Sequence, residues 1–173
     1  MKCKRCLLLV LMSLMVLSFV GCGKKNGSNE SGVKKGELPY GFVWGQKSDT
    51  IYETLKSEVG EEKIRIAEYD GSKTEISLKD ATFLEKNCEE FYFGLKNGSL
   101  ERVHAGYTFE KSEDAQNFYD ELVNMYSKIG EGHEEEDGNG TMNYTLEIND
   151  TRYNVCLVKD RNQVGINLRE IEK

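Results

Sequence analysis

The chain has 173 residues, of which 23 are basic and 30 are acidic, so its formal net charge is −7 at pH 7. An acidic surface repels phosphate groups, which argues against a protein that binds nucleic acid or anionic lipid through its own surface. The length suits a single domain with a core of its own.

The first 21 residues have the features of a bacterial signal peptide. A positively charged start precedes an apolar run at residues 7–20, which is too short to span a bilayer because that takes about 20 apolar residues. Residues 18–22, with the sequence SFVGC, resemble the lipobox of bacterial lipoproteins, with Phe19 where that pattern prefers leucine. The resemblance implies cleavage before Cys22 and attachment of diacylglycerol to its thiol.

Two alternatives for this segment are an ordinary secretory signal, which would leave Cys22 as a plain thiol, and an uncleaved anchor, which would need a longer apolar run. Two or three acyl chains hold a protein stably on a membrane, whereas one chain does not. We therefore expect a lipid anchor on the extracytoplasmic face of a bacterial membrane. Removal of residues 1–21 takes away three of the 23 basic residues and none of the 30 acidic ones, which leaves a net charge of −10.

Residues 22–38 are predicted to be a lipidated, flexible tether, because they are rich in glycine, lysine and small polar residues. Residues 39–173 then form one folded domain. Two cysteines remain in it, Cys88 and Cys156, which form one disulfide or stay as two thiols.

The first half of the domain begins with an apolar segment, residues 41–45, that predicts a short strand or extended entry. Ser48 is the expected cap of a helix that runs to about Glu58 and stops at Gly60. Alternation of apolar and polar residues then predicts four strands, at residues 63–69, 75–79, 88–95 and 100–109.

The turn at residues 95–100 allows two hairpins. A two-residue Asn97–Gly98 loop would place Phe91 opposite His104, whereas a three-residue loop with Gly98 in a left-handed bulge would place Phe91 opposite Val103. We predict the second, because it gathers the apolar residues on one face of the sheet. This face would also hold Phe93, Ala105, Tyr107 and Phe109.

The second half begins with a helix capped by Ser112 and ended by Gly130, with an apolar stripe of Ala115, Phe118, Tyr119, Leu122, Val123, Tyr126 and Ile129. Three strands follow, with a loop at Asn149–Asp150 that pairs Leu146 with Tyr153. A turn near residues 160–161 is expected to pair Leu157 with Val164 and Val155 with Ile166.

These elements predict an α+β fold in which two helices pack on one face of an antiparallel sheet, in the order β-α-β-β-β-β-α-β-β-β. Helix and strands alternate twice, which suggests a loose two-unit repeat. Residues 41–55 and 91–103 resemble repeats of small exported domains of the beta-lactamase-inhibitor-protein and BamE/SmpA lipoprotein type, with Gln46 where those often have methionine and no glycine directly after Leu55. The resemblance implies a protein-binding sheet surface and supplies no catalytic residues.

An acidic segment at residues 131–141 invites comparison with a calcium-binding loop. Asp137 and Asn139 fit positions three and five of an EF-hand, but position one is Glu135 and position twelve is Leu146, where the bidentate glutamate is needed. We expect a solvated loop that joins a helix to a strand, and no metal or other cofactor. Neither of the two histidines has metal-ligand spacing, and His104 is expected on the polar face near Glu90.

No nucleophile motif or phosphate-binding loop occurs in the sequence, so we do not expect an enzyme. The favoured function is a monomeric protein-interaction module of the cell envelope, whose partner meets the polar face of the sheet. A small-ligand sensor or carrier is the alternative, and a polar face without any partner is the simplest reading. The expected partner-binding residues are Tyr92, Arg102, His104, Arg152 and Asn154.

Overall fold

The computed structural model describes residues 38–134, 140–148 and 151–171, which all lie in one compact unit of the chain, Ser31–Lys173. The predicted signal peptide, Cys22 and nearly all of the predicted tether lie outside the described residues. Within those ranges no helix has the length and apolar character needed to cross a membrane.

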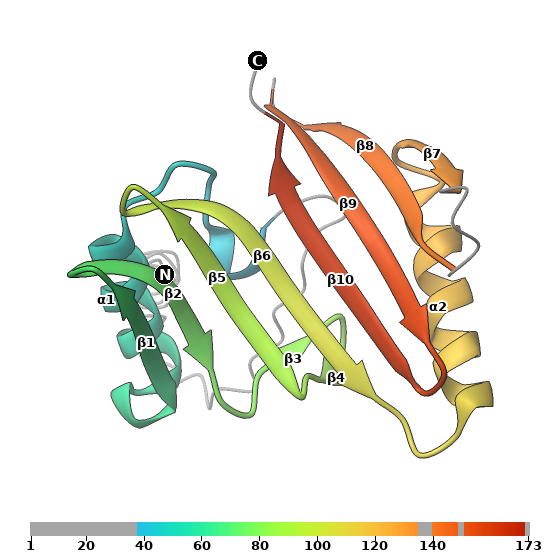
Figure 1. The fold of residues 1–173 in the computed structure, drawn as a ribbon, viewed down its shortest axis with the longest axis horizontal. Coiled ribbons are helices and arrows are strands. Elements are labelled where there is room, and N and C mark those ends of the chain that lie inside the picture. Colours follow the sequence, from blue (N-terminus) through green and yellow to red (C-terminus); the bar gives the residue numbers. More distant parts are fainter. Residues whose placement is uncertain (1–37, 135–139, 149–150, 172–173) are drawn as a thin grey trace, which may run out of the picture. The chain divides into compact units, whose positions relative to one another are not determined.

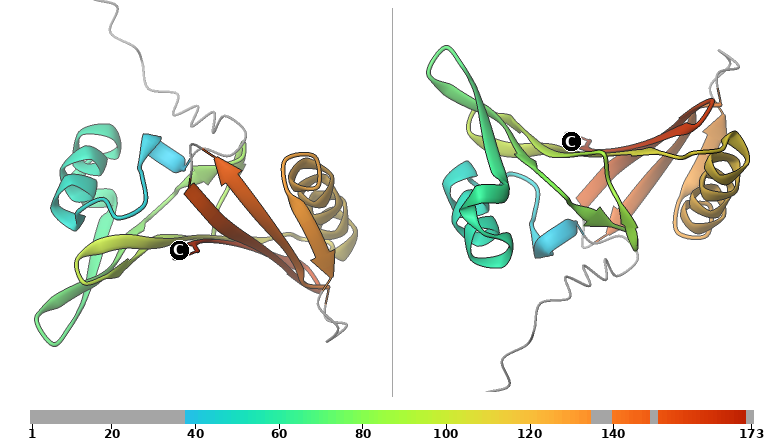
Figure 2. Two further views of the ribbon diagram at one scale, coloured as in Figure 1. Left: turned by 90° about the horizontal axis from the view of Figure 1, so that it is seen from above. Right: turned by 90° about the horizontal axis from the view of Figure 1, so that it is seen from below.

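Eight strands form one antiparallel sheet in the order β1-β2-β5-β6-β10-β9-β8-β7 (Figure 1). Two helices lie on the same face of this sheet (Figure 2), and the predicted α+β class is confirmed. The helices are α1 (Ser48–Val59) and α2 (Ser112–Tyr126), and short 3-10 turns are η1 (Pro39–Gly41) and η2 (Glu61–Lys63). The strands are β1 (Ile64–Tyr69), β2 (Ser72–Leu78), β5 (Glu90–Lys96), β6 (Ser99–Thr108), β7 (Glu131–Glu134), β8 (Met142–Ile148), β9 (Thr151–Asp160) and β10 (Gln163–Glu170), and β3 (Thr82–Phe83) pairs separately with β4 (Lys86–Asn87).

The main sheet consists of two units of the same design, each a helix followed by four strands. In the first unit α1 precedes β1, β2, β5 and β6, and in the second α2 precedes β7 to β10. Each helix begins against the last hairpin turn of its unit: the Ser48 amide donates to the Gly98 carbonyl oxygen at 3.0 Å, and Ser112 Oγ donates to the Arg161 carbonyl oxygen at 3.1 Å. The last strands of the two units, β6 and β10, pair in the middle of the sheet.

The core lies between the helices and one face of the sheet. Strand pairing carries this apolar face across both units, since Val103 pairs with Phe93 and Leu168, and Leu168 pairs with Val155. Burial of each large apolar side chain stabilises the fold by about 1.5–3 kcal/mol. The core side chains of the helices are Ile51, Leu55, Ala115, Phe118, Tyr119, Leu122 and Tyr126.

Two hairpin predictions were wrong in register although the faces were right. Asn97 and Gly98 form a two-residue turn with φ of 52° and 70°, as this dipeptide prefers, and the extra residue lies further along β6 at Glu101. Phe91 therefore pairs with Ala105 instead of Val103. The predicted pairing of Leu146 with Tyr153 is confirmed.

The β9–β10 turn lies at Arg161–Asn162, which shifts the predicted pairing by two residues, so Leu157 pairs with Ile166 and Val155 with Leu168. A shift of two keeps every side chain on its predicted face, because side chains alternate with a period of two. The apolar face was thus predicted correctly despite the wrong pairs.

Several boundaries also differ from the predictions. Lys47 and Lys111 occupy the helix cap positions, without side-chain capping bonds, and Ser48 and Ser112 are the first helical residues. Residues 41–45 are not a strand, and they reach β6 through the Gly45 amide, which donates to the Leu100 carbonyl oxygen at 2.9 Å. The second helix ends at Tyr126, before the expected stop.

Candidate functional site: the open face of the sheet

The sheet face opposite the helices, here called the open face, carries most of the residues predicted to bind a partner. Alternation with the buried positions places Tyr92 of β5, Arg102 and His104 of β6, and Asn167 of β10 on it. None of the helices in the described ranges covers this face (Figure 2).

A stack of three side chains lies at the junction of the first unit with the second. The Tyr92 and His104 rings are nearly parallel, with centroids 4.8 Å apart, and the Arg102 guanidinium carbon lies 5.3 Å from the Tyr92 centroid. Such cation–π contacts contribute about 0.5–1 kcal/mol where they are exposed. The stack therefore holds three of the predicted partner-binding side chains in place in the unbound protein.

His104 is also bound across the junction to Asn167. Its Nδ1 lies 2.8 Å from Asn167 Oδ1, which is a hydrogen-bond distance. The other ring nitrogen, Nε2, lies 3.6 Å from Glu90 Oε2, as expected from the predicted proximity of these two residues. His104 is thereby oriented by contacts from both neighbouring strands.

Beside this stack the open face is hollowed into a groove of about 500 Å³. The floor of the groove is formed by Gly106 of β6 and Gly165 of β10, which pair directly and leave two neighbouring positions without side chains. The groove is lined by Glu89, Glu90, His104, Gly106, Tyr107, Thr108, Val158, Asp160, Gln163, Val164, Gly165 and Asn167.

The lining of the groove is acidic. Among the described residues that line it are three carboxylates, those of Glu89, Glu90 and Asp160, and no lysine or arginine. Glu89 accepts a short hydrogen bond from Thr108 Oγ1, and Glu90 is exposed. The negative charge therefore surrounds a floor made of backbone.

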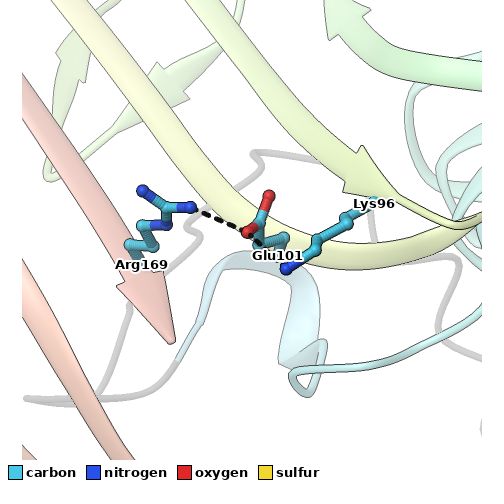
Figure 3. Close-up of polar contacts among 3 residues, drawn as sticks. All are labelled: Lys96, Glu101 and Arg169. Carbon is cyan, nitrogen blue, oxygen red and sulfur yellow. Dashed lines mark hydrogen bonds and ion pairs between the residues drawn. The ribbon is translucent and has the colours of Figure 1, made fainter. Parts of the chain in front are cut away.

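The other end of the open face carries three basic side chains, those of Lys96, Arg102 and Arg169. The bulged Glu101 lies 2.9 Å from Arg169 Nη2 and 3.7 Å from Lys96 Nζ (Figure 3). The hydrogen bond from Arg169 lowers the pKa of the Glu101 carboxyl below its ordinary value. The Glu101 carboxylate thus contacts two cationic side chains, and Arg102 is a third cation near them.

The remaining two predicted partner-binding residues lie on the same face but away from the stack. Asn154 of β9 pairs with Arg169, which in turn pairs with Arg102, so Asn154 is two strands from the stack. Arg152 pairs with Glu147 at the far side of β9. Sequence reasoning missed Asn167 and the two floor glycines, although glycine inside an alternating strand pattern is a signal for a close approach.

The two cysteines of the domain lie on opposite faces of the sheet, and no disulfide joins them. Cys88 packs against the core, where burial raises the pKa of its thiol, and Cys156 alternates with the buried Val155 and Leu157 on the open face. A raised pKa keeps the Cys88 thiol protonated, which makes it a weak nucleophile.

The acidic segment at residues 131–141, which was expected to be a solvated loop, is only partly described. Residues 131–134 form the edge strand β7, so the expected loop begins as a strand, while Glu135, Asp137 and Asn139 lie outside the described residues. Among the described residues no group of three histidine, cysteine or acidic side chains is placed to hold a metal ion. The same residues include no buried side-chain nitrogen or oxygen that lacks a hydrogen-bond partner.

Comparisons with protein-family models, curated proteins and solved structures find no match for this chain.

Proposed function

We propose that this protein is a lipoprotein of the bacterial cell envelope, held by Cys22 on the extracytoplasmic face of a membrane, and that its open face binds another envelope protein. The lipobox-like sequence supports the anchor. In this role the protein is a binding module and not an enzyme.

The observation that carries the binding role is the ordered stack of Arg102, Tyr92 and His104 on a sheet face that no described helix covers. Tyrosine and arginine are enriched where proteins bind one another, and a stacked arginine loses less side-chain entropy on binding. His104 is only 16% exposed in its side chain, so the stack presents the Tyr92 and Arg102 side chains outward while its base stays rigid.

A small-ligand sensor is the second candidate, because a groove of about 500 Å³ falls within the usual range of ligand sites. The groove lies on the open face of the sheet and not between the sheet and the helices. A groove at the surface suits a chemical group that a bound partner protein presents. We therefore place the small-ligand sensor second.

Crosslinking in the host bacterium tests the binding role. A photo-crosslinking residue at Asn154 on the open face should capture one defined envelope protein, and the matched residue at Asn117, exposed on α2, should not. Tyr92→Ala combined with Arg102→Ala should abolish capture from Asn154. Equal capture from both positions, or none from Asn154, would refute the binding role.

The anchor is tested separately. Cys22→Ser should move the protein from the membrane fraction to the soluble fraction, because it removes the thiol that receives the lipid. If the variant is still extracted only by detergent, the lipobox interpretation is wrong.

A further inference from the structure

We propose that the groove over Gly106 and Gly165 receives a single lysine or arginine side chain from the protein that binds the open face. This inference rests on the proposed function and names the chemistry that the partner must present. It starts from the two glycines, because neither is expected in the middle of a central strand.

The fold does not require glycine at position 165. Its φ is not positive, and among the described residues a Cβ built there would meet only His104 Cε1, at an ordinary contact distance of 3.9 Å. At Gly106 the nearest atom would be His104 Nε2 at 3.3 Å, a tight contact with a side chain. Glycine inside a strand is less stable than alanine, so its presence at 165 weakens the sheet without relieving any strain.

The missing side chains create a space of defined shape. Glu90, Gly106, Gly165 and Val158 form one row across four neighbouring strands, with a side chain at each end and none between. Three strand spacings separate the ends of this row by about 14 Å. His104 and Asn167 close the groove on one side, and Thr108 and Gln163 close it on the other.

The charges around this space select the occupant. The rim carries Glu89, Glu90 and Asp160, and in the part of the chain that the structure describes no lysine or arginine lines the groove. A lysine or arginine has an apolar stem and a charged head. Its stem can lie on the glycine floor beside Val158, while its head meets the rim carboxylates in charge-assisted hydrogen bonds.

The groove and the stack then act on different parts of the same partner. Arg102 lies four residues before Gly106 on β6, about 14 Å along the strand. Arg102 carries a positive charge, whereas the groove is lined by negative charges. A partner segment that places a basic side chain in the groove and a carboxylate near Arg102 would match both ends. Opposite charges at fixed spacing also set the direction in which the segment binds.

A titration of the full-length chain in detergent micelles, followed by the backbone amide resonances of Gly106 and Gly165, tests the inference. The probe is the capped pentapeptide Gly-Ser-Arg-Ser-Gly, with citrulline or glutamate in place of arginine as matched controls. The arginine peptide should shift both resonances to saturation with a dissociation constant of about 1 mM, as expected for one side chain. The citrulline and glutamate peptides should bind at least about tenfold more weakly.

Variants of the protein separate the groove from the rest of the face. Gly165→Val fills the floor and Glu90→Gln removes a rim charge, so each should weaken binding of the arginine peptide at least about tenfold. Glu147→Gln makes the same charge change on the open face outside the groove and should leave binding unchanged. Equal binding of the citrulline peptide, equal binding of free arginine, or undiminished binding by both groove variants would overturn the inference.

The two proposals fail differently. If Asn154 still captures its partner when Gly165→Val is present, and to the same extent, the open face binds a protein but the groove takes no part. If Asn154 captures nothing while the arginine peptide still binds the groove, the binding role fails and the site does not serve a protein partner.

Discussion

Gly165→Ala is expected to stabilise the protein, although most substitutions in a central strand destabilise. Of the atoms that the structure describes, the added Cβ meets only His104 Cε1, at 3.9 Å, and the backbone at this position suits any L-residue. The gain comes from the lower conformational entropy of the unfolded chain and from better strand propensity, and amounts to roughly 0.5–1 kcal/mol.

A matched substitution at a second strand glycine should act in the opposite direction. In Gly132→Ala the new Cβ would lie 2.2 Å from Cε1 of Tyr144, a residue that is only 1% exposed, so its ring cannot move away freely. The edge strand β7 must therefore shift, and such overpacking costs about 1–3 kcal/mol.

Urea unfolding measures both variants against the parent chain. With a slope of about 2 kcal/mol per molar urea, the midpoint should rise by about 0.3–0.5 M for Gly165→Ala and fall by about 0.5–1.5 M for Gly132→Ala. A lower midpoint for Gly165→Ala would show that the fold itself needs glycine there. The inference that the groove exists for a ligand would then lose its basis.

Three further predictions concern buried and paired groups. Tyr107→Phe removes the hydroxyl that donates to the Phe83 carbonyl oxygen at 2.9 Å, so the free energy of unfolding should fall by about 1–2 kcal/mol, and an unchanged urea midpoint would contradict this. Burial raises the pKa of Tyr153 from 10.0 to about 12, so its contribution to stability is complete below pH 10 and is lost as the pH rises toward 12. Tyr153→Phe should therefore make the fall of the unfolding free energy between pH 10 and 12 less steep. Identical slopes for the variant and the parent chain would refute the assignment. Arg169→Gln should raise the pKa of the Glu101 carboxyl toward its ordinary value in a carboxyl NMR titration, whereas an unmoved pKa would show that the ion pair is absent in solution.

The faces of the sheet were predictable from the sequence, but the pairs were not. Alternation assigns a residue to a face through a period of two, so it cannot distinguish registers that differ by two residues. The β9–β10 hairpin shows this limit, because Leu157 pairs with Ile166 and not with Val164 while all three stay in the core. At the β5–β6 hairpin the preference of Asn97–Gly98 for a two-residue turn predicted the loop length better than the apolar pattern did. The bulge that keeps the apolar residues on one face lies in β6 instead of in the turn.

The part of the candidate site that consists of large polar or aromatic side chains was predictable from the sequence, and the glycine-floored groove was not. Tyr92, Arg102 and His104 stand out as large polar or aromatic groups at alternating positions, and the structure brings them together. The groove is marked by the absence of side chains at Gly106 and Gly165, which are 59 positions apart in the chain. Their contact depends on the pairing of β6 with β10, which no local pattern specifies.

The same pairing ties the groove to the core. β6 and β10 are the last strands of their units, so the pairing protects two edges that would otherwise be open, and it also places Gly106 opposite Gly165. A slip of one residue between these strands would break the contact of Ala105 with Ile166 and turn a strand's apolar side chains outward. Because the core penalises any such slip, the packing of one face holds the two floor glycines together on the other. Neither unit alone contains this floor, so we expect the groove to exist only where both units are joined.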